Sequence, residues 1–179
     1  GLMSARVIEI NGETCILSIT RDISDRQRAE QDLRTAHQEL AQAYEATLQG
    51  WVRALEMRER ETAHHSRRVV ELTTQMAQAL GISGEELVHI QRGALLHDIG
   101  KMGVPDNILR KPDALTPDEW VIMCQHPQFA VALLQEIDYL RKPMEIPYYH
   151  HEKWNGNGYP RGLCGEEIPL GARIFAIAD

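Results

Sequence analysis

The chain has 179 residues, 43% of them hydrophobic, which is enough to form a core in at least one domain. Its formal net charge of −7 at pH 7 argues against a general nucleic-acid-binding surface, because tracking a phosphate backbone requires an excess of basic residues. The three cysteines, Cys15, Cys124 and Cys164, form no C-x-x-C pair, so neither a disulfide framework nor a thiolate zinc site is indicated.

Isolated cysteines of this kind fit a reducing cytoplasm best. No apolar run approaches about 18 residues, so we expect no membrane span within these residues. The chain begins with Gly1 and reaches Asp179 inside an apolar helical pattern. We therefore expect a fragment cut at both ends, and a membrane anchor upstream of Gly1 is compatible with this expectation.

Two short β-favouring runs, residues 4–10 and 13–20, are separated by Asn11-Gly12, a dipeptide typical of hairpin turns. A lone hairpin is only marginally stable, so we expect it to be the remainder of a larger sheet. The exit from the second run, residues 20–26, resembles the end of PAS sensory domains. Residues 1–25 are therefore interpreted as the C-terminal end of a PAS-like domain, with an unrelated hairpin as the alternative.

Residues 26–60 contain no proline and a single glycine, Gly50, and they predict one long helix. Its apolar positions recur at near-heptad spacing with one stutter, which is typical of a coiled coil with a local change of supercoil. Because this seam is narrow and its flanks are polar, we favour a homodimeric signalling helix over a helix packed on its own domain. The seam consists of Leu33, Ala36, Leu40, Tyr44, Leu48, Trp51 and Leu55.

The first candidate metal ligands lie where the next domain is predicted to begin, near Glu61. His65 shares a helix face with Val69 and Met76, and Glu61 lies one turn earlier on the same face. A histidine on an apolar face is more often a satisfied core residue than a ligand. The carboxylate one turn away favours the metal site instead.

Another pair of candidate ligands follows the helix that Ser83–Glu86, a capping-box pattern, is expected to open. The apolar stripe of this helix continues to His97 and Asp98, where an unpaired carboxylate would be costly. A divalent metal removes that cost, and imidazole and carboxylate are suitable ligands for it. Gly100 permits a sharp exit that keeps Lys101 beside the pair, although an ammonium group is not a ligand.

Three more histidines lie near predicted helix ends. Thr116–Glu119 combines a capping box with proline at the first helical position, and the helix that it opens ends at His126-Pro127. His126 therefore lies at a junction between two helices. His150 and His151 would diverge by about 100° on a helix, so they serve two metals, or one metal only at a helix end.

Residues 155–162 are rich in glycine, so we expect a loop whose backbone approaches a ligand closely, with Tyr159 fixed by Pro160. Pro169 then begins the last helix, which places Asp179 on its apolar face. The complete set of candidates exceeds the ligands that one zinc ion needs and suits two or three metals. It comprises Glu61, His65, His97, Asp98, His126, His150, His151 and Asp179.

These residues resemble the signatures of HD-GYP phosphodiesterases, a branch of the HD superfamily. The resemblance covers residues 61–179 and implies a mainly α fold, a helical bundle of the HD type. The β-hairpin remnant and the linker helix would precede it. The resemblance rests on His97-Asp98 with Lys101, Gly158-Tyr159-Pro160, His65-Ser66, His126-Pro127, His150-His151-Glu152 and residues 168–174 leading to Ala178-Asp179.

The resemblance also implies the ligands and the reaction. Asp98 would bridge the metals, and Glu61 marks members of the three-metal type, with iron or manganese as the implied metal. The implied substrate is cyclic di-GMP, which is opened to the linear dinucleotide and in some members taken on to GMP. The remaining implied ligands are His65, His97, His126, His150, His151 and Asp179.

The chemistry of the residues agrees with this reaction. Cations held by Asp98 lower the pKa of water and hold the phosphate oxygens, and Lys101 would stabilise the charge that develops on phosphorus. Tyr159, within the expected substrate-binding loop Gly158–Pro160, either shapes the substrate pocket or anchors the loop. Glu152 either orients a ligand histidine or caps the loop.

Two other functions stay open. One is an HD-superfamily hydrolase of another nucleotide, against which the Gly158–Pro160 loop argues. The other is a non-catalytic module that binds nucleotides or proteins in signalling, against which the complete ligand set argues. Because family members continue past Asp179, we expect the fragment by itself to have impaired activity.

Overall fold

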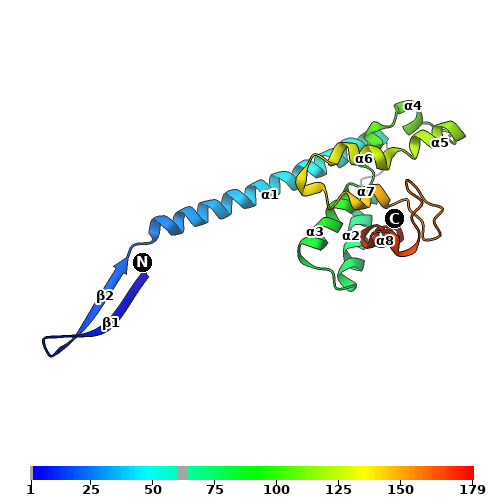
Figure 1. Ribbon diagram of the computed structural model, residues 1–179. Helices are drawn as coiled ribbons and strands as arrows, with labels where there is room; N and C mark the ends of the chain where they lie inside the picture. Colours follow the sequence, from blue (N-terminus) through cyan, green and yellow to red (C-terminus); the bar gives the residue numbers. More distant parts are fainter. Residues whose placement is uncertain (1, 60–63) are drawn as a thin grey trace. The chain divides into compact units, whose positions relative to one another are not determined.

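The computed structural model describes residues 2–59 and 64–179 (Figure 1). The described chain is mainly helical, with one two-stranded antiparallel sheet at its N-terminus, so the predicted fold class is confirmed. The chain divides into two compact units, Gly1–Ala46 and Thr47–Asp179, and the boundary between them falls within the long helix α1.

The hairpin pairs β1 (Leu2–Ile10) with β2 (Glu13–Arg21). Asn11 and Gly12 form its turn with φ values of 53° and 85°. These are the positive values that a two-residue turn of this handedness requires, so the predicted turn is confirmed. The PAS-like domain stays a prediction.

The helix α1 (Ser24–Glu59) agrees with the single long helix predicted for residues 26–60. Leu33 and Leu40, in its first part, are 71% and 51% exposed. Leu48 and Leu55, near its end, are buried in the second unit. The dimeric coiled coil stays a prediction, and the exposure of the first part of the seam is compatible with it.

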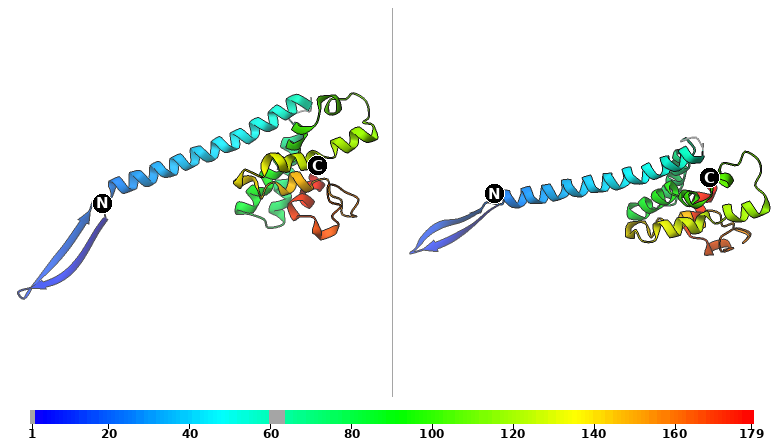
Figure 2. Two further views of the ribbon diagram at one scale, coloured as in Figure 1. Left: turned by 45° about the horizontal axis from the view of Figure 1, so that its top comes forward. Right: turned by 90° about the horizontal axis from the view of Figure 1, so that it is seen from above.

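The second unit contains two hydrophobic cores. One joins the end of α1 to α6 and includes Leu48, Leu96 and Ile99. The other includes Ile90 and Ala94, and it lies where α2, α3, α7 and α8 pack against one another (Figures 1 and 2). The His97-Asp98 segment therefore follows a helix of the second core and is flanked by residues of the first.

After α1, the described part of this unit consists of α-helices and short 3₁₀ helices. In chain order they are α2 (His64–Ala79), α3 (Gly84–Leu95), η1 (Ile99–Gly103), α4 (Asp106–Leu109), α5 (Pro117–Met123), α6 (His126–Leu134), η2 (Asp138–Leu140), α7 (Glu145–Tyr149), η3 (Gly165–Glu167) and α8 (Leu170–Ala178). No helix in the described part of the chain has the length and apolar character needed to cross a membrane.

The two predicted capping boxes have different outcomes. The box at Thr116 forms, because the Thr116 hydroxyl accepts from the Glu119 N–H and the Glu119 carboxylate accepts from the Thr116 N–H. The box at Ser83 does not form: α3 begins where predicted, but the Ser83 side chain makes no capping hydrogen bond. Gly84 has a φ of 62°, which takes the first residue of the helix out of the helical conformation that a capping box requires.

The segment after Asp98 packs directly on α6. A Cβ atom added at Gly100 would overlap the carbonyl oxygen of His126 and lie 2.6 Å from the backbone nitrogen of Ala130. Only glycine allows the two backbones to approach this closely. Gly100 thus places the His97-Asp98 segment beside His126.

Candidate metal centre

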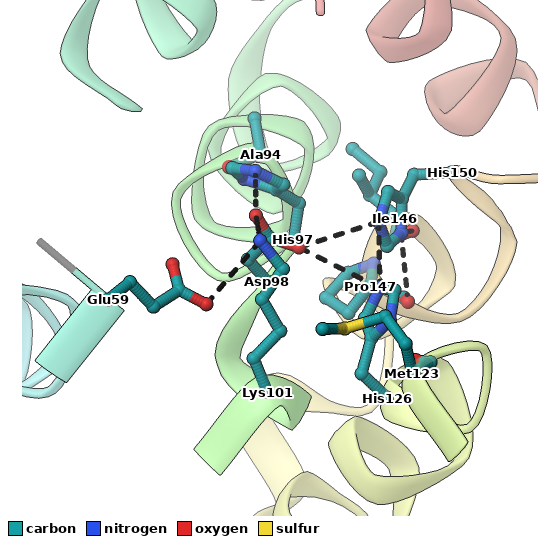
Figure 3. Close-up of polar contacts among 10 residues, drawn as sticks. All are labelled: Glu59, Ala94, His97, Asp98, Lys101, Met123, His126, Ile146, Pro147 and His150. Atoms are coloured by element: carbon teal, nitrogen blue, oxygen red, sulfur yellow. Dashed lines mark hydrogen bonds and ion pairs between the residues drawn. The ribbon is translucent and has the colours of Figure 1, made fainter. Parts of the chain in front are cut away.

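Asp98 lies at the centre of a cluster of ionisable side chains, just after α3 (Figure 3). Its Oδ2 atom is 3.0 Å from the Nε2 atom of His97 and 2.9 Å from the Nζ atom of Lys101. Its Oδ1 atom faces the other way, 3.7 Å from His126 Nε2 and 3.9 Å from His150 Nε2. One carboxylate therefore faces two groups of partners.

His126 begins α6, at the predicted junction after α5, and His150 follows the last residue of α7. Asp98, His126, His150 and His151 each offer a ligand atom, and these atoms all lie within 4.8 Å of one another. The structure thus brings together four of the predicted ligands, from segments far apart in the sequence. His97 joins them through its contact with Asp98.

Main-chain carbonyl groups orient three of the imidazole rings. The Nδ1 atom of His97 is 2.9 Å from the Ala94 oxygen, and that of His126 is 2.9 Å from the Met123 oxygen. The Nδ1 atom of His150 is 3.0 Å from the Pro147 oxygen. Because a carbonyl oxygen only accepts hydrogen bonds, each Nδ1 donates. In the neutral rings of His126 and His150, the lone pair of Nε2 is thereby directed into the cluster. The Nε2 atom of His97 instead faces the Asp98 carboxylate, which outweighs burial and raises the pKa of His97.

The charges in the cluster also suit a cation. Burial alone would raise the pKa of Asp98, but the neighbouring His97 and Lys101 hold it well below its ordinary value. Burial lowers the pKa of His126, and burial with the neighbouring His151 lowers that of His150 much further. A carboxylate and neutral imidazoles are the protonation states that divalent metal binding requires, so these residues fit a metal centre.

His151 and Tyr159 form the side of the cluster that faces the glycine-rich loop. Burial, with the neighbouring His126, lowers the pKa of His151 to about 4. The Tyr159 ring stacks on the His151 ring at a centroid distance of 4.7 Å, and the backbone N–H of Tyr159 donates to the His151 carbonyl. Burial and the nearby Cys124 raise the pKa of Tyr159, so the phenol stays protonated.

A cavity opens beside the cluster, and the other two residues of the predicted loop motif, Gly158 and Pro160, do not line it. Gly158 packs so closely on the backbone of Glu152 and Lys153 that a Cβ atom would overlap it. Its contribution is therefore to bring the loop against the segment that holds His150 and His151.

Glu152 is buried, and its hydrogen bonds favour the loop-capping alternative over the orientation of a histidine. Its Oε1 atom accepts from the Arg161 N–H at 2.7 Å, and its Oε2 atom accepts from the Leu163 N–H at 2.9 Å. One carboxylate thereby holds both ends of a turn in the loop beside Tyr159.

A cavity of about 320 Å³ opens beside the cluster. One wall is polar and includes His97, Asp98, Lys101 and the histidines of the cluster. Asp179 also lines this cavity, as predicted from its place on the apolar face of α8. The apolar side chains in the lining, here called the apolar wall, are Leu109, Leu115, Trp120 and Met123.

Two predicted ligands fall at the edge of the described structure. Glu61 lies outside the described residues. His65 belongs to α2, but the position of its side chain is not described. Their roles as metal ligands stay predictions.

Glu59 is a site residue that the sequence reasoning missed. Its side chain is 6% exposed, lines the cavity, and lies 3.4 Å from Lys101 Nζ through Oε1 (Figure 3). A sequence signal existed: Leu48, Val52 and Leu55 are buried along α1, and the same helical stripe continues to Glu59. The predicted near-heptad seam shares Leu48 and Leu55 with this stripe, but it ended at Leu55, one turn before Glu59.

Residues 51–179 match a family model described as the HD domain. The chain belongs to the HD domain family. The match begins within α1, so the last turns of this helix are part of the HD domain.

Several named relatives of this chain are cyclic dinucleotide phosphodiesterases. A "Cyclic di-GMP phosphodiesterase" of Thermotoga maritima is 45% identical over 126 residues, which are 69% of this chain and 34% of the relative. A "3'3'-cGAMP-specific phosphodiesterase 2" of Vibrio cholerae is 41% identical over 128 residues, which are 70% of this chain and 24% of the relative. The chain thus spans about a third or less of these two relatives.

A solved structure has the same fold. It is an HDG"Y"P protein from Bdellovibrio bacteriovorus, with a TM-score of 0.54 and 29% identity, covering 65% of this chain and 38% of that chain. Together with the named relatives, it confirms the predicted resemblance to the HD-GYP branch.

Proposed function

We propose that this HD domain belongs to a metal-dependent phosphodiesterase that hydrolyses cyclic di-GMP to the linear dinucleotide or to GMP. The single observation that supports it best is the cluster of Asp98, His126, His150 and His151, with Lys101 beside it. The cluster supplies ligands for divalent ions and a cation for the phosphate in one cavity. The Thermotoga relative, by its name, points to the same substrate.

The residues around the cavity would divide the work as follows. Asp98 and the histidines would hold two or three ions, with iron or manganese the expected metals. When bound, these ions supply the Lewis acidity that activates water and neutralises phosphate charge. Lys101 would hold its ammonium group against the phosphate, where positive charge favours the transition state. His97 keeps the Asp98 carboxylate turned toward the other histidines.

The apolar wall would bind a base of the substrate. Trp120 is 53% exposed, although it lines the cavity together with Leu115 and Met123. An aromatic ring at the rim of a phosphate site provides a stacking surface for a purine, which is worth about 1–3 kcal/mol per base. Phosphate on the polar wall and base on the apolar wall match the two chemical parts of a nucleotide.

A second substrate, 3'3'-cGAMP, is suggested by the Vibrio relative. Both substrates have two phosphodiester bonds in a ring, and the metal cluster would treat them alike. Discrimination would then come from the wall that contacts the base. A non-catalytic binding module is the remaining alternative, and the metal-ready protonation states of the histidines argue against it.

The parts outside the HD domain have proposed roles in control. A PAS-like domain at residues 1–25 would belong to a sensor, and residues 26–60 would form a homodimeric helix that transmits its state. The protein would then be a cytoplasmic or membrane-anchored signalling enzyme.

The decisive experiment is a turnover assay on the full-length protein, purified anaerobically and with its metal content measured. Cyclic di-GMP, 3'3'-cGAMP and a nucleoside triphosphate are compared at equal concentration. We expect the linear dinucleotide or GMP from cyclic di-GMP, and loss of the activity after chelation. Bound metal without turnover of either cyclic dinucleotide would refute the proposal, and preferential turnover of 3'3'-cGAMP would transfer it to that substrate.

A further inference from the structure

Arg58, in the last turn of α1, binds the segment that follows the His97-Asp98 pair. Its guanidinium group donates to the carbonyl oxygens of Met102 at 2.8 Å and Val104 at 2.6 Å, and to that of Lys101 at 3.3 Å. It also pairs with the Asp106 carboxylate at 2.7 Å. Arg58 therefore contacts four of the six residues in the segment 101–106.

Two of these acceptors lie at the end of the 3₁₀ helix η1: Met102 is in its last turn and Val104 directly follows it. The last carbonyl groups of a helix have no intrahelical donor. The Lys101 carbonyl also accepts from the Val104 N–H, so Arg58 adds a second donor there. A guanidinium group has five N–H donors in a fixed plane, so it can bind several such carbonyls at once. Arg58 thereby determines the path of the backbone on the C-terminal side of Lys101.

The neighbouring residue of α1 contacts the other end of Lys101. Glu59 Oε1 lies 3.4 Å from Lys101 Nζ, which is also 2.9 Å from Asp98 Oδ2. Arg58 and Glu59 diverge by about 100° around the helix, so one reaches the backbone of Lys101 and the other its ammonium group. The last turn of α1 thus contacts Lys101 at both ends.

We propose that Arg58 is a positioning residue that acts through Lys101, and that the last turn of α1 connects this helix mechanically to the metal centre. The proposal rests on the proposed function insofar as Lys101 stabilises the reacting phosphate. It goes beyond that function by naming the contacts through which a displacement of α1 changes the reaction rate.

The first test compares kcat and KM among variants of the metal-loaded protein. We expect Arg58→Ala to lower kcat between about tenfold and a hundredfold, as displacements of about 1 Å do, with a smaller change in KM. Arg58→Lys should retain intermediate activity, because one ammonium group replaces only part of the fork. Arg53→Ala, an exposed arginine on α1, is the control with unchanged kinetics.

A variant of the ion-pair partner separates the two kinds of contact. Asp106→Asn removes the carboxylate charge but leaves the carbonyl groups in place, so we expect a much smaller loss of kcat than for Arg58→Ala. An equal loss in both variants would overturn the assignment to the backbone contacts.

The decisive test is a double-mutant cycle with Lys101→Ala. If Arg58 acts through Lys101, Arg58→Ala should cause no further loss of kcat in the Lys101→Ala background. A merely structural role would lower the melting temperature and would give losses of kcat that multiply across the two sites. Multiplicative losses would therefore overturn the proposal.

A binding cycle tests the same link without turnover. The affinity of the metal-loaded protein for inorganic phosphate, measured by calorimetry, should fall in Arg58→Ala and in Lys101→Ala, and no further in the double variant. If cyclic dinucleotides are not hydrolysed, the proposed function fails while this cycle still decides the role of Arg58. Unchanged phosphate affinity in Arg58→Ala, with reduced affinity in Lys101→Ala, would refute that role.

Discussion

The Nε2 atoms of His126 and His150 lie 3.3 Å apart, although both rings donate their Nδ1 hydrogens to main-chain carbonyl groups. In two neutral rings these Nε2 atoms would both be acceptors, which repel each other at this distance unless a positive charge lies near them. Asp98 Oδ1 is within 3.9 Å of both atoms and would share that charge. A divalent cation would satisfy all three groups at once.

Replacing Asp98 by asparagine should abolish hydrolysis and reduce bound metal while the helices remain. The amide has nearly the same shape but no charge, so it cannot bridge cations. We expect a loss of at least about a thousandfold in kcat, the magnitude of removing a main electrostatic group. Activity and metal analysis check this, with circular dichroism for the fold and the exposed Asp113→Asn as control. Retained activity would contradict the bridging role.

Replacing Glu61 by alanine should lower the bound metal by about one ion per chain, since a third ion needs an additional carboxylate. This prediction comes from the sequence alone, because Glu61 lies outside the described residues. Elemental analysis after anaerobic purification measures it. An unchanged stoichiometry would favour a two-metal centre.

The metal-free protein should lose stability as the pH falls from 6.5 to 4. The pKa of His151 is about 4 in the folded chain, against about 6.5 for an unfolded histidine. Between these values the unfolded chain binds more protons, so the free energy of unfolding rises with pH and falls on acidification. The effect of His151 alone is on the order of 2 kcal/mol, after a discount for its partial exposure.

Urea unfolding at several pH values measures this slope, and His151→Ala should flatten it. His97 acts in the opposite direction. Burial favours its neutral form, but Asp98 outweighs burial and raises the pKa, so its contribution is lost as the pH rises above the folded value. Constant or increasing stability between pH 6.5 and 4.5 would show that the histidines are not buried in neutral form.

Replacing Gly100 by alanine should destabilise the HD domain and disturb the metal centre together. The added Cβ atom would overlap the carbonyl oxygen of His126, so the two backbones must separate. We expect a loss of about 1–3 kcal/mol, as for other overpacked sites, and weaker metal binding. Gly50→Ala is the matched control: nothing lies within 4 Å of the added atom.

In that control, alanine within α1 should stabilise the chain by about 0.5–1 kcal/mol. Thermal and chemical unfolding of both variants, with metal titration, distinguish the two effects. Equal behaviour of the two glycine variants would contradict the close packing at Gly100.

Replacing Trp120 by alanine should raise KM for the cyclic dinucleotide about tenfold to a hundredfold, with less effect on kcat, because a base-stacking surface is lost. Trp120→Phe should retain most of the affinity. Inhibition by inorganic phosphate, which has no base, should not change. Trp154→Ala removes an exposed tryptophan that does not line the cavity and serves as control. A KM that Trp120→Ala leaves unchanged would place the base elsewhere.

The polar half of the site could be predicted from sequence because each ligand lies on a local pattern. His97 and Asp98 continue an apolar stripe, and His126 lies at a junction that Thr116 and Pro127 mark. Such signals depend only on neighbouring residues. The family resemblance then indicated that the separate segments form one site.

The other half could not be predicted in this way. The exposed Trp120 lines the cavity only because the fold brings α5 to the same cavity as Asp98, and residues so far apart in the chain share no local sequence pattern. In the sequence, Arg58 looks like an ordinary charged residue on a helix. The groups that accept its hydrogen bonds are backbone carbonyls, which no sequence pattern reveals. The failure at Ser83 has a similar cause, since the conformation of Gly84 decides whether a capping box forms.

The groups that orient His97, His126 and His150 are main-chain oxygens of Ala94, Met123 and the Ile146-Pro147 segment. Every amino acid has such an oxygen, so no substitution at these positions deletes the acceptor. Evolution is therefore free to change the surrounding side chains for packing or substrate preference without losing the ring orientation that the metals need. The orientation of these rings is therefore robust to substitution at the residues that supply the oxygens, and sensitive to a change such as Gly100→Ala that moves the backbone itself.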